Sequence, residues 1–103
     1  MEEDAVADTN LLMEGKGTAT TILNLVEYPK AMERELEILW PEPQDYERAI
    51  DIMSVLFEAG APVPAIDVLI ASVCIGRGRV LRTKDKHFQE IADRFPVFRL
   101  RLE

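Results

Sequence analysis

Four acidic residues stand where a carboxylate is not expected. Asp8 ends a short apolar run, Asp85 follows a predicted strand, Glu27 lies on an otherwise apolar helical segment, and Asp67 is the only charge between residues 65 and 75. Burying an ionised carboxylate costs several kcal/mol unless it is paired or bound to a cation. These four acids are therefore the residues most able to do chemistry, and Asp67 in particular requires a partner.

The order of the acids along the chain suggests how they could meet. In a parallel α/β sheet, ligands bind beyond the carboxyl ends of the strands, where we expect Asp8 and Asp85 to emerge, together with Asp67 if it opens its helix. Clustered carboxylates repel one another unless a divalent cation lies among them, and such hard oxygen ligands favour Mg²⁺ or Mn²⁺. The alternative is that Asp67 and Asp8 only cap helices, since Asp is a preferred N-cap residue. Their spacing alone favours neither interpretation.

The apolar pattern predicts the elements that would position these acids. We expect strands at 5–7, 18–21, 36–40, 80–83 and 97–102. We expect helices at 22–28, 43–59, 65–75 and 88–95, with Gly76 and Gly78 ending the third of them. Strands that alternate with helices predict an α/β fold, here a three-layer α/β/α sandwich around one mostly parallel sheet.

The first connection of this predicted sheet is short. Only residues 11–16 separate Asn10 from the turn at Gly17, whereas a parallel crossover usually needs about a dozen residues or more. Either this crossover is naturally shortened, or residues are missing from the sequence at this point. If Glu27 consequently fails to reach the other acids, three carboxylates would bind a metal more weakly than four.

Length and net charge limit the number of domains and the classes of protein to which this chain can belong. The 103 residues fit one domain, 1–103, and 19 acids against 12 bases give a net charge of −7, which argues against a general nucleic-acid-coating protein. Five of the bases nevertheless lie within 77–86, and three of them are candidates for phosphate contacts: Arg82, Lys84 and Lys86. The single cysteine, Cys74, can form no internal disulfide.

Sequence features also bear on location. No apolar run approaches the 18 or so residues that span a bilayer, and Met1–Asp4 is acidic where a secretory signal would be basic. We therefore expect a cytoplasmic protein without a membrane segment.

Four motifs occur in a fixed order along the chain. They are Val6-Ala7-Asp8-Thr9-Asn10-Leu11-Leu12, Leu25-Val26-Glu27-Tyr28-Pro29, Ile66-Asp67-Val68-Leu69-Ile70-Ala71 and Leu81-Arg82-Thr83-Lys84-Asp85-Lys86-His87-Phe88. Together they resemble the PIN domain family, and most closely the VapC-type toxins of prokaryotic toxin–antitoxin pairs. The resemblance covers nearly the whole chain and implies a PIN-like α/β/α sandwich.

The resemblance implies an activity and the residues that perform it. The implied activity is an endoribonuclease in which Asp8, Glu27, Asp67 and Asp85 bind Mg²⁺ or Mn²⁺ and hydrolyse a phosphodiester in RNA. Thr9 or Asn10, and Thr83, would form hydrogen bonds around these acids. His87 receives no role, because a histidine between Lys86 and Phe88 is more often a solvated residue than a base.

Partners follow from the same resemblance. A homodimer is expected, and a cognate antitoxin would occupy the acidic groove. The second hypothesis is a catalytically weak or inactive module that acts by protein association through the apolar faces of its helices. The exposed side of the 43–59 helix and the 36–40 segment are its candidate contact surfaces.

Overall fold

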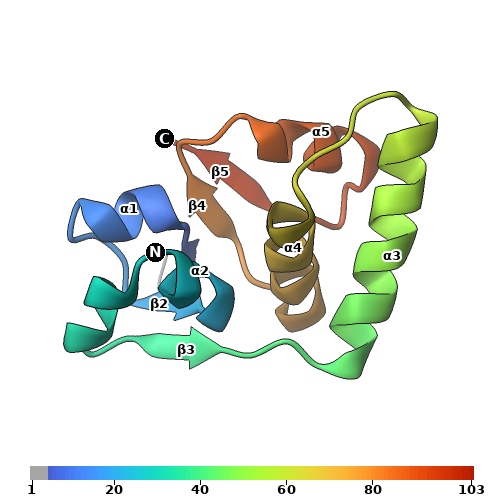
Figure 1. Ribbon diagram of the computed structural model, residues 1–103. Helices are drawn as coiled ribbons and strands as arrows, with labels where there is room; N and C mark the ends of the chain where they lie inside the picture. Colours follow the sequence, from blue (N-terminus) through green and yellow to red (C-terminus); the bar gives the residue numbers. More distant parts are fainter. Residues whose placement is uncertain (1–4) are drawn as a thin grey trace.

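A computed structural model describes residues 5–103 and shows short parallel strands surrounded by helices (Figure 1). In chain order the elements are β1 (Val6–Ala7), α1 (Thr9–Met13), β2 (Ala19–Thr21), α2 (Ile22–Glu27), the 3-10 helix η1 (Pro29–Glu33), β3 (Glu37–Leu39), α3 (Pro43–Glu58), α4 (Ala65–Arg77), β4 (Leu81–Thr83), α5 (His87–Arg94) and β5 (Leu100–Leu102). The acidic segment Met1–Asp4, whose charge argues against a secretory signal, lies outside the described residues.

The strands form two sheets. One has the order β1-β4-β5 and the other pairs β2 with β3, and every pairing is parallel. The prediction of a PIN-like three-layer sandwich around one sheet is therefore wrong. The hydroxyl of Thr20 donates to the carbonyl of Ala7 over 2.7 Å, so β2 meets β1 through a side chain. At Gly17 (φ 92°), a Cβ would lie 2.4 Å from that of Ala7, so only glycine allows this close approach.

Between β1 and β2, the short connection contains α1 and a turn. The amides of Glu14 and Gly15 donate to the carbonyls of Leu11 and Leu12, which ends the helix and returns the chain toward β2. Between residues 8 and 18, this five-residue helix is the only helix of the shortened first crossover.

Specific residues determine where the two longest helices, α3 and α4, begin or end. Pro43 starts α3, and the side chain of Asp45 accepts a hydrogen bond from the backbone amide of Glu42 at 2.8 Å there. Gly78 ends α4 in the left-handed conformation (φ 64°), which favours glycine. Gly76 does not end α4, contrary to the prediction: it lies inside the helix, where a Cβ would come within 2.6 Å of Asp45 Oδ1.

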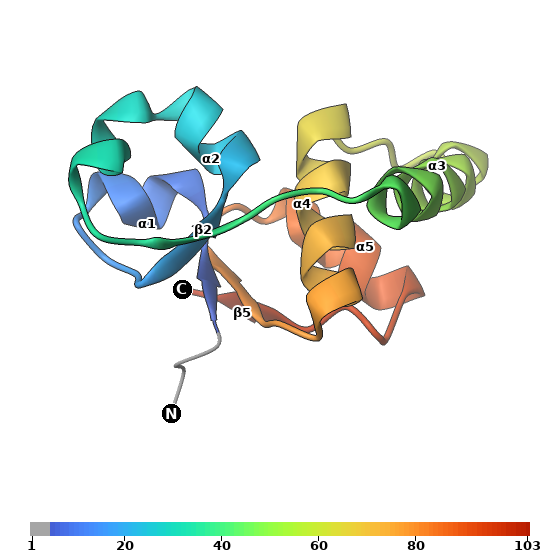
Figure 2. The ribbon, with the colours of Figure 1, turned by 90° about the horizontal axis from the view of Figure 1, so that it is seen from below.

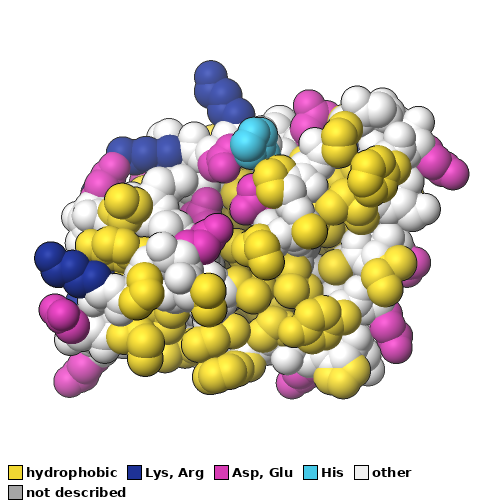
Figure 3. All heavy atoms as spheres, viewed as in Figure 1, with side chains coloured by type: hydrophobic (Ala, Val, Ile, Leu, Met, Phe, Trp, Pro, Cys, Tyr) yellow, Lys and Arg dark blue, Asp and Glu magenta, His cyan; other side chains and the backbone are white. Residues whose placement is uncertain are grey.

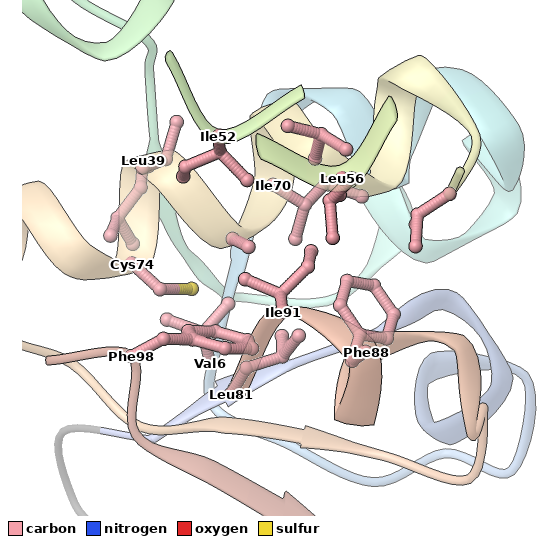
Figure 4. Packing of buried hydrophobic residues seen from close by; sticks show 14 of the residues in the cluster. Val6, Leu39, Ile52, Leu56, Ile70, Cys74, Leu81, Phe88, Ile91 and Phe98 are labelled. Carbon is pink, nitrogen blue, oxygen red and sulfur yellow. The ribbon is translucent and has the colours of Figure 1, made fainter. Parts of the chain in front are cut away.

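Buried apolar side chains hold the helices to the strands. The larger cluster joins α3, α4 and α5 to the β1-β4-β5 sheet and includes Ile52, Ile70, Leu81 and Ile91 (Figure 4). A smaller cluster packs α1 against α2 and η1. Figure 2 shows these two helix groups on either side of the strands.

None of the helices within residues 5–103 combines the length and the apolar character that crossing a bilayer requires.

Candidate metal centre

Asp8 and Asp85 emerge at the same edge of the β1-β4-β5 sheet. Asp8 directly follows β1, and Asp85 lies two residues beyond Thr83, the last residue of β4. The two strands are parallel neighbours, and the backbone amide of Asp8 donates to the carbonyl of Arg82 over 3.0 Å. The carboxyl ends of both strands therefore deliver an acid to one place.

Hydrogen bonds orient the buried carboxylate of Asp8. Its Oδ1 accepts from Asn24 Nδ2 at 2.8 Å, and its Oδ2 accepts from the Thr83 hydroxyl at 2.6 Å. The Thr83 oxygen in turn accepts from Asn10 Nδ2 at 3.2 Å and from the backbone amide of Asp85 at 3.0 Å. This chain of contacts ties α1, α2 and β4 to one carboxylate, and it places Asn10 and Thr83 beside the acids.

Glu27 reaches the same place despite the short crossover. It is the last residue of α2, and its Oε1 accepts from the Thr9 hydroxyl at 2.6 Å. The Thr9 oxygen also accepts from Asn24 Nδ2 at 3.0 Å. Asn24 lies one turn before Glu27, so a single helix supplies both the acid and the amide that holds its neighbours.

Asp67 comes from the first turn of α4 and completes the acidic cluster. Burial, and next the negative charges of Asp8, Asp85 and Glu27, raise the pKa of Asp67 from 3.8 to about 6, with His87 opposing the rise. Carboxylate oxygens of Asp67 and Asp85 lie within 4.8 Å of each other, which accounts for part of this repulsion.

Helix capping does not explain these acids. The residue before α4 is Pro64, and no side chain caps this helix. Asp8 occupies the N-cap position of α1, but its side chain makes no capping hydrogen bond there. The alternative left open by the spacing is therefore wrong for both residues.

The four acids line one surface hollow of about 530 Å³. Its lining residues are Asp8, Thr9, Asn10, Met13, Glu27, Pro64, Ile66, Asp67, Asp85 and His87. Acidic side chains gather beside the imidazole at this face, next to a broad apolar surface (Figure 3). Oxygen donors from four carboxylates fit Mg²⁺ or Mn²⁺, which prefer hard ligands.

Two of the three predicted phosphate contacts are engaged in ion pairs. Arg82 forms a bidentate ion pair with Glu103, and Lys84 forms an ion pair with Glu14. Lys86 is exposed immediately before α5, and its sequence neighbours Asp85 and His87 line the acidic hollow.

Sequence reasoning missed two polar residues of this site. Asn24 is fully buried and contacts both Asp8 and Thr9. Its signal was the Thr21-x-x-Asn24 spacing of a capping box, which the structure forms. His87 was given no role, yet it lines the hollow and its Nδ1 lies 3.1 Å from Asp85 Oδ1.

Comparisons with known proteins show that the fold is similar to that of a solved structure. No protein-family model and no curated protein sequence matches the chain. One similar solved chain belongs to the crystal structure of VapBC2 from Rickettsia felis bound to a DNA fragment from their promoter. The TM-score is 0.77 at 17% identity, over 95% of this chain and 97% of that chain.

These comparisons correct the assignment made from the motifs. The similar chain is itself small, since a chain of 103 residues spans nearly all of it, and it comes from a VapBC2 assembly. No family model places the sequence among PIN domains. The assignment to the PIN domain family of VapC-type toxins is therefore wrong, and at this identity the likeness shows the fold alone.

Proposed function

We propose that this chain is a divalent-metal-dependent endoribonuclease that works within a toxin–antitoxin pair. The observation that carries the proposal is the convergence of Asp8, Glu27, Asp67 and Asp85 on one hollow. The likeness to a chain of a VapBC2 complex supports the toxin–antitoxin context.

The residues of the hollow have distinct parts in this proposal. Asp8, Asp67, Asp85 and Glu27 would hold a Mg²⁺ or Mn²⁺ ion. When bound, such an ion lowers the pKa of a water molecule and stabilises the charge that develops on a phosphodiester. Asn24 and Thr83 fix the direction of the Asp8 oxygens, and this restraint would limit the freedom that Asp8 loses when it binds an ion.

The surroundings of the acids suit a nucleic-acid strand. Met13 and Ile66 are exposed apolar residues on the wall of the hollow, where they can contact bases or sugars. Lys86, which lies between the lining residues Asp85 and His87 in the sequence, would meet a phosphate at the rim. As substrate we propose RNA, and the same assay tests DNA.

The test is cleavage of RNA by the purified chain. We expect cleavage with Mn²⁺ or Mg²⁺ that EDTA abolishes and that Asp67→Asn lowers at least about a hundredfold, as loss of charge stabilisation does in other active sites. Asp51→Asn is the matched control, because it removes the same charge from an exposed position on α3. Intact RNA across a metal titration would refute the proposal, and cleavage of DNA alone would refute RNA as the substrate.

A second candidate function is protein association, favoured by a separate apolar hollow. This hollow of about 290 Å³ lies between α3 and α4 and is lined by Tyr46, Ala49, Ile50, Met53, Ala65, Val68 and Leu69. Ile50 is 69% exposed and Tyr46 is 51% exposed at its edge. Exposed apolar surface of this kind is typical of association sites.

We propose that a second copy of the chain occupies this apolar hollow, which we call the groove between α3 and α4. One face offers both a hollow and protruding side chains, as a two-fold interface requires, because each copy must supply the same surface. The homodimer expected from the sequence would then use α3 and α4. The net charge of −7 opposes self-association, although salt screens that repulsion.

A further inference from the structure

His87 points its ring toward the acidic hollow from the start of α5. Its Nδ1 lies 3.1 Å from Asp85 Oδ1 and 3.8 Å from Asp67 Oδ2. One ligand atom from each of these three residues lies within 4.8 Å of the others. The imidazole comes from a different helix than Asp67, so the tertiary fold brings the two together.

We propose that His87 is a metal ligand, and that Asp67, Asp85 and His87 form a mixed oxygen and nitrogen site that binds a first-row transition metal in preference to Mg²⁺. The proposal rests on the metal-dependent function proposed above and specifies which ion the site selects. Imidazole nitrogen favours Zn²⁺, Co²⁺ and similar ions, whereas Mg²⁺ binds almost entirely through oxygen.

The spacing of the ligand atoms agrees with this assignment. Metal–nitrogen and metal–oxygen bonds of about 2.1 Å put adjacent ligands about 3.0 Å apart at a right angle and about 3.4 Å apart at a tetrahedral angle. The separations of 3.1 and 3.8 Å are close to these values. The third pair of ligand atoms, from Asp67 and Asp85, lies within 4.8 Å, so the side chains would move closer together to hold one ion.

Local hydrogen bonds restrict Asp85, one of the three ligands. The backbone amide of His87 donates to Asp85 Oδ1 at 2.9 Å, and the backbone amide of Asp85 donates to the Thr83 hydroxyl at 3.0 Å. Asp85 is therefore held between β4 and α5. Its neighbour His87 is 60% exposed, so the ring can turn without disturbing the core.

The charge balance of the hollow independently indicates a cation. Within residues 5–103, no Lys or Arg forms an ion pair with Asp8, Glu27, Asp67 or Asp85. Elsewhere in the same range, acids such as Asp45, Glu37 and Glu103 pair with arginines. The hollow thus concentrates negative charge that the described residues leave unbalanced.

Pulsed electron paramagnetic resonance of the Mn²⁺-loaded chain tests the assignment directly. We expect nitrogen coupling from an imidazole in the wild-type chain and its loss in His87→Gln. Calorimetric titration should show Zn²⁺ or Co²⁺ binding weakened by at least about tenfold in this variant, because loss of even an outer partner of a metal ligand costs about 10- to 100-fold. Mg²⁺ binding should change little.

Controls separate this inference from the function on which it rests. Gln89→Ala changes another exposed residue of α5 and should leave the nitrogen coupling and the metal affinities unchanged. Bound Mn²⁺ without nitrogen coupling, in a chain that still cleaves RNA, would overturn the role of His87 and leave the nuclease standing. A wild-type chain that binds no metal and leaves RNA intact would overturn both.

Discussion

The side-chain amide of Asn24 donates a hydrogen bond to the carboxylate of Asp8 over 2.8 Å, and both side chains are buried. The same Asn24 accepts from the Thr21 hydroxyl at 2.7 Å and so also belongs to the cap of α2. A residue that stabilises a helix start therefore also sets the direction of a proposed metal ligand. Stability and site geometry are coupled at this position.

Asn24→Ala should lower the free energy of unfolding by about 2 kcal/mol. The substitution breaks the cap of α2 and removes one of the buried hydrogen-bond donors to the Asp8 carboxylate. Urea unfolding in EDTA measures this change. Gln44→Ala, at an exposed position of α3, is the control and should stay within about 0.5 kcal/mol of wild type. Equal stability of the two variants would show that the Asn24 contacts contribute nothing.

Asp67 should make stability depend on pH in the direction opposite to an ordinary ion-paired acid. Its pKa is about 6 in the folded chain and 3.8 in the reference state. Between these values the folded chain holds a proton that the unfolded chain has released. The contribution of Asp67 to the free energy of unfolding therefore falls as the pH rises from about 4 to about 6, and it stays low above that.

Asp67→Asn removes this dependence, since an amide does not ionise. In metal-free buffer we expect the variant to gain on the order of 1 kcal/mol over wild type at about pH 7.5, after allowance for solvent screening in an open hollow, and little at about pH 3.5. Urea unfolding at several pH values gives the difference. Asp51→Asn should show no such trend, and a gain of Asp67→Asn that is independent of pH would contradict the explanation.

Asp45 holds the far end of α4 to α3. Burial disfavours its charge, yet the amide of Glu42 and the guanidinium groups of Arg48 and Arg77 lower the pKa of Asp45 below its usual value. The ion pairs span 2.8 Å to Arg48 and 3.2 Å to Arg77. Gly76 leaves the space for this cluster, because a Cβ there would overlap Asp45.

Asp45→Ala should therefore lower the free energy of unfolding by about 3 kcal/mol, since it leaves two partly buried cations without their acid. Thermal or urea unfolding measures the loss. Asp51→Ala removes an exposed acid from the same helix and should change stability by less than about 0.5 kcal/mol. Similar losses in both variants would mean that the cluster is not a stabilising contact.

Local patterns predicted the elements better than their assembly. The proline and glycine positions marked α3 and the apolar runs marked the strands, because these signals act within a few residues. The two sheets meet where Thr20 and Gly17 contact Ala7, and no local pattern reveals a contact between these segments. The position of Gly76 inside α4 likewise depends on Asp45, 31 residues earlier.

In the acidic site, too, local patterns predicted some residues, whereas others depend on tertiary contacts. Asp8 and Asp85 could be expected at one sheet edge, because acids after parallel strands emerge together. Asn24 and His87 were not foreseen, since the Thr21-x-x-Asn24 spacing predicts only a helix cap and a histidine between Lys86 and Phe88 carries no signal until the fold brings it to the acids. The ion pairs of Arg82 and Lys84 also depend on tertiary contacts.

Self-association through the groove between α3 and α4 is the last prediction. Ile50→Lys should weaken dimerisation by more than about tenfold, because burying a lysine without a partner against an apolar surface costs more than 1.4 kcal/mol. The side chain of Ile50 is mostly exposed, so the monomer should keep its fold and its stability. Sedimentation equilibrium of wild type and variant at matched concentrations gives both dissociation constants.

Asp51→Lys is the matched control for this prediction, because it introduces the same side chain at the next exposed position of α3, outside the residues that line the groove. It should leave dimerisation within about threefold of wild type and, by reducing the net negative charge, should slightly favour it. A wild-type chain that sediments as a monomer would refute the second copy as the occupant of the groove. A dimer that Ile50→Lys leaves intact would show that the copies meet through another surface.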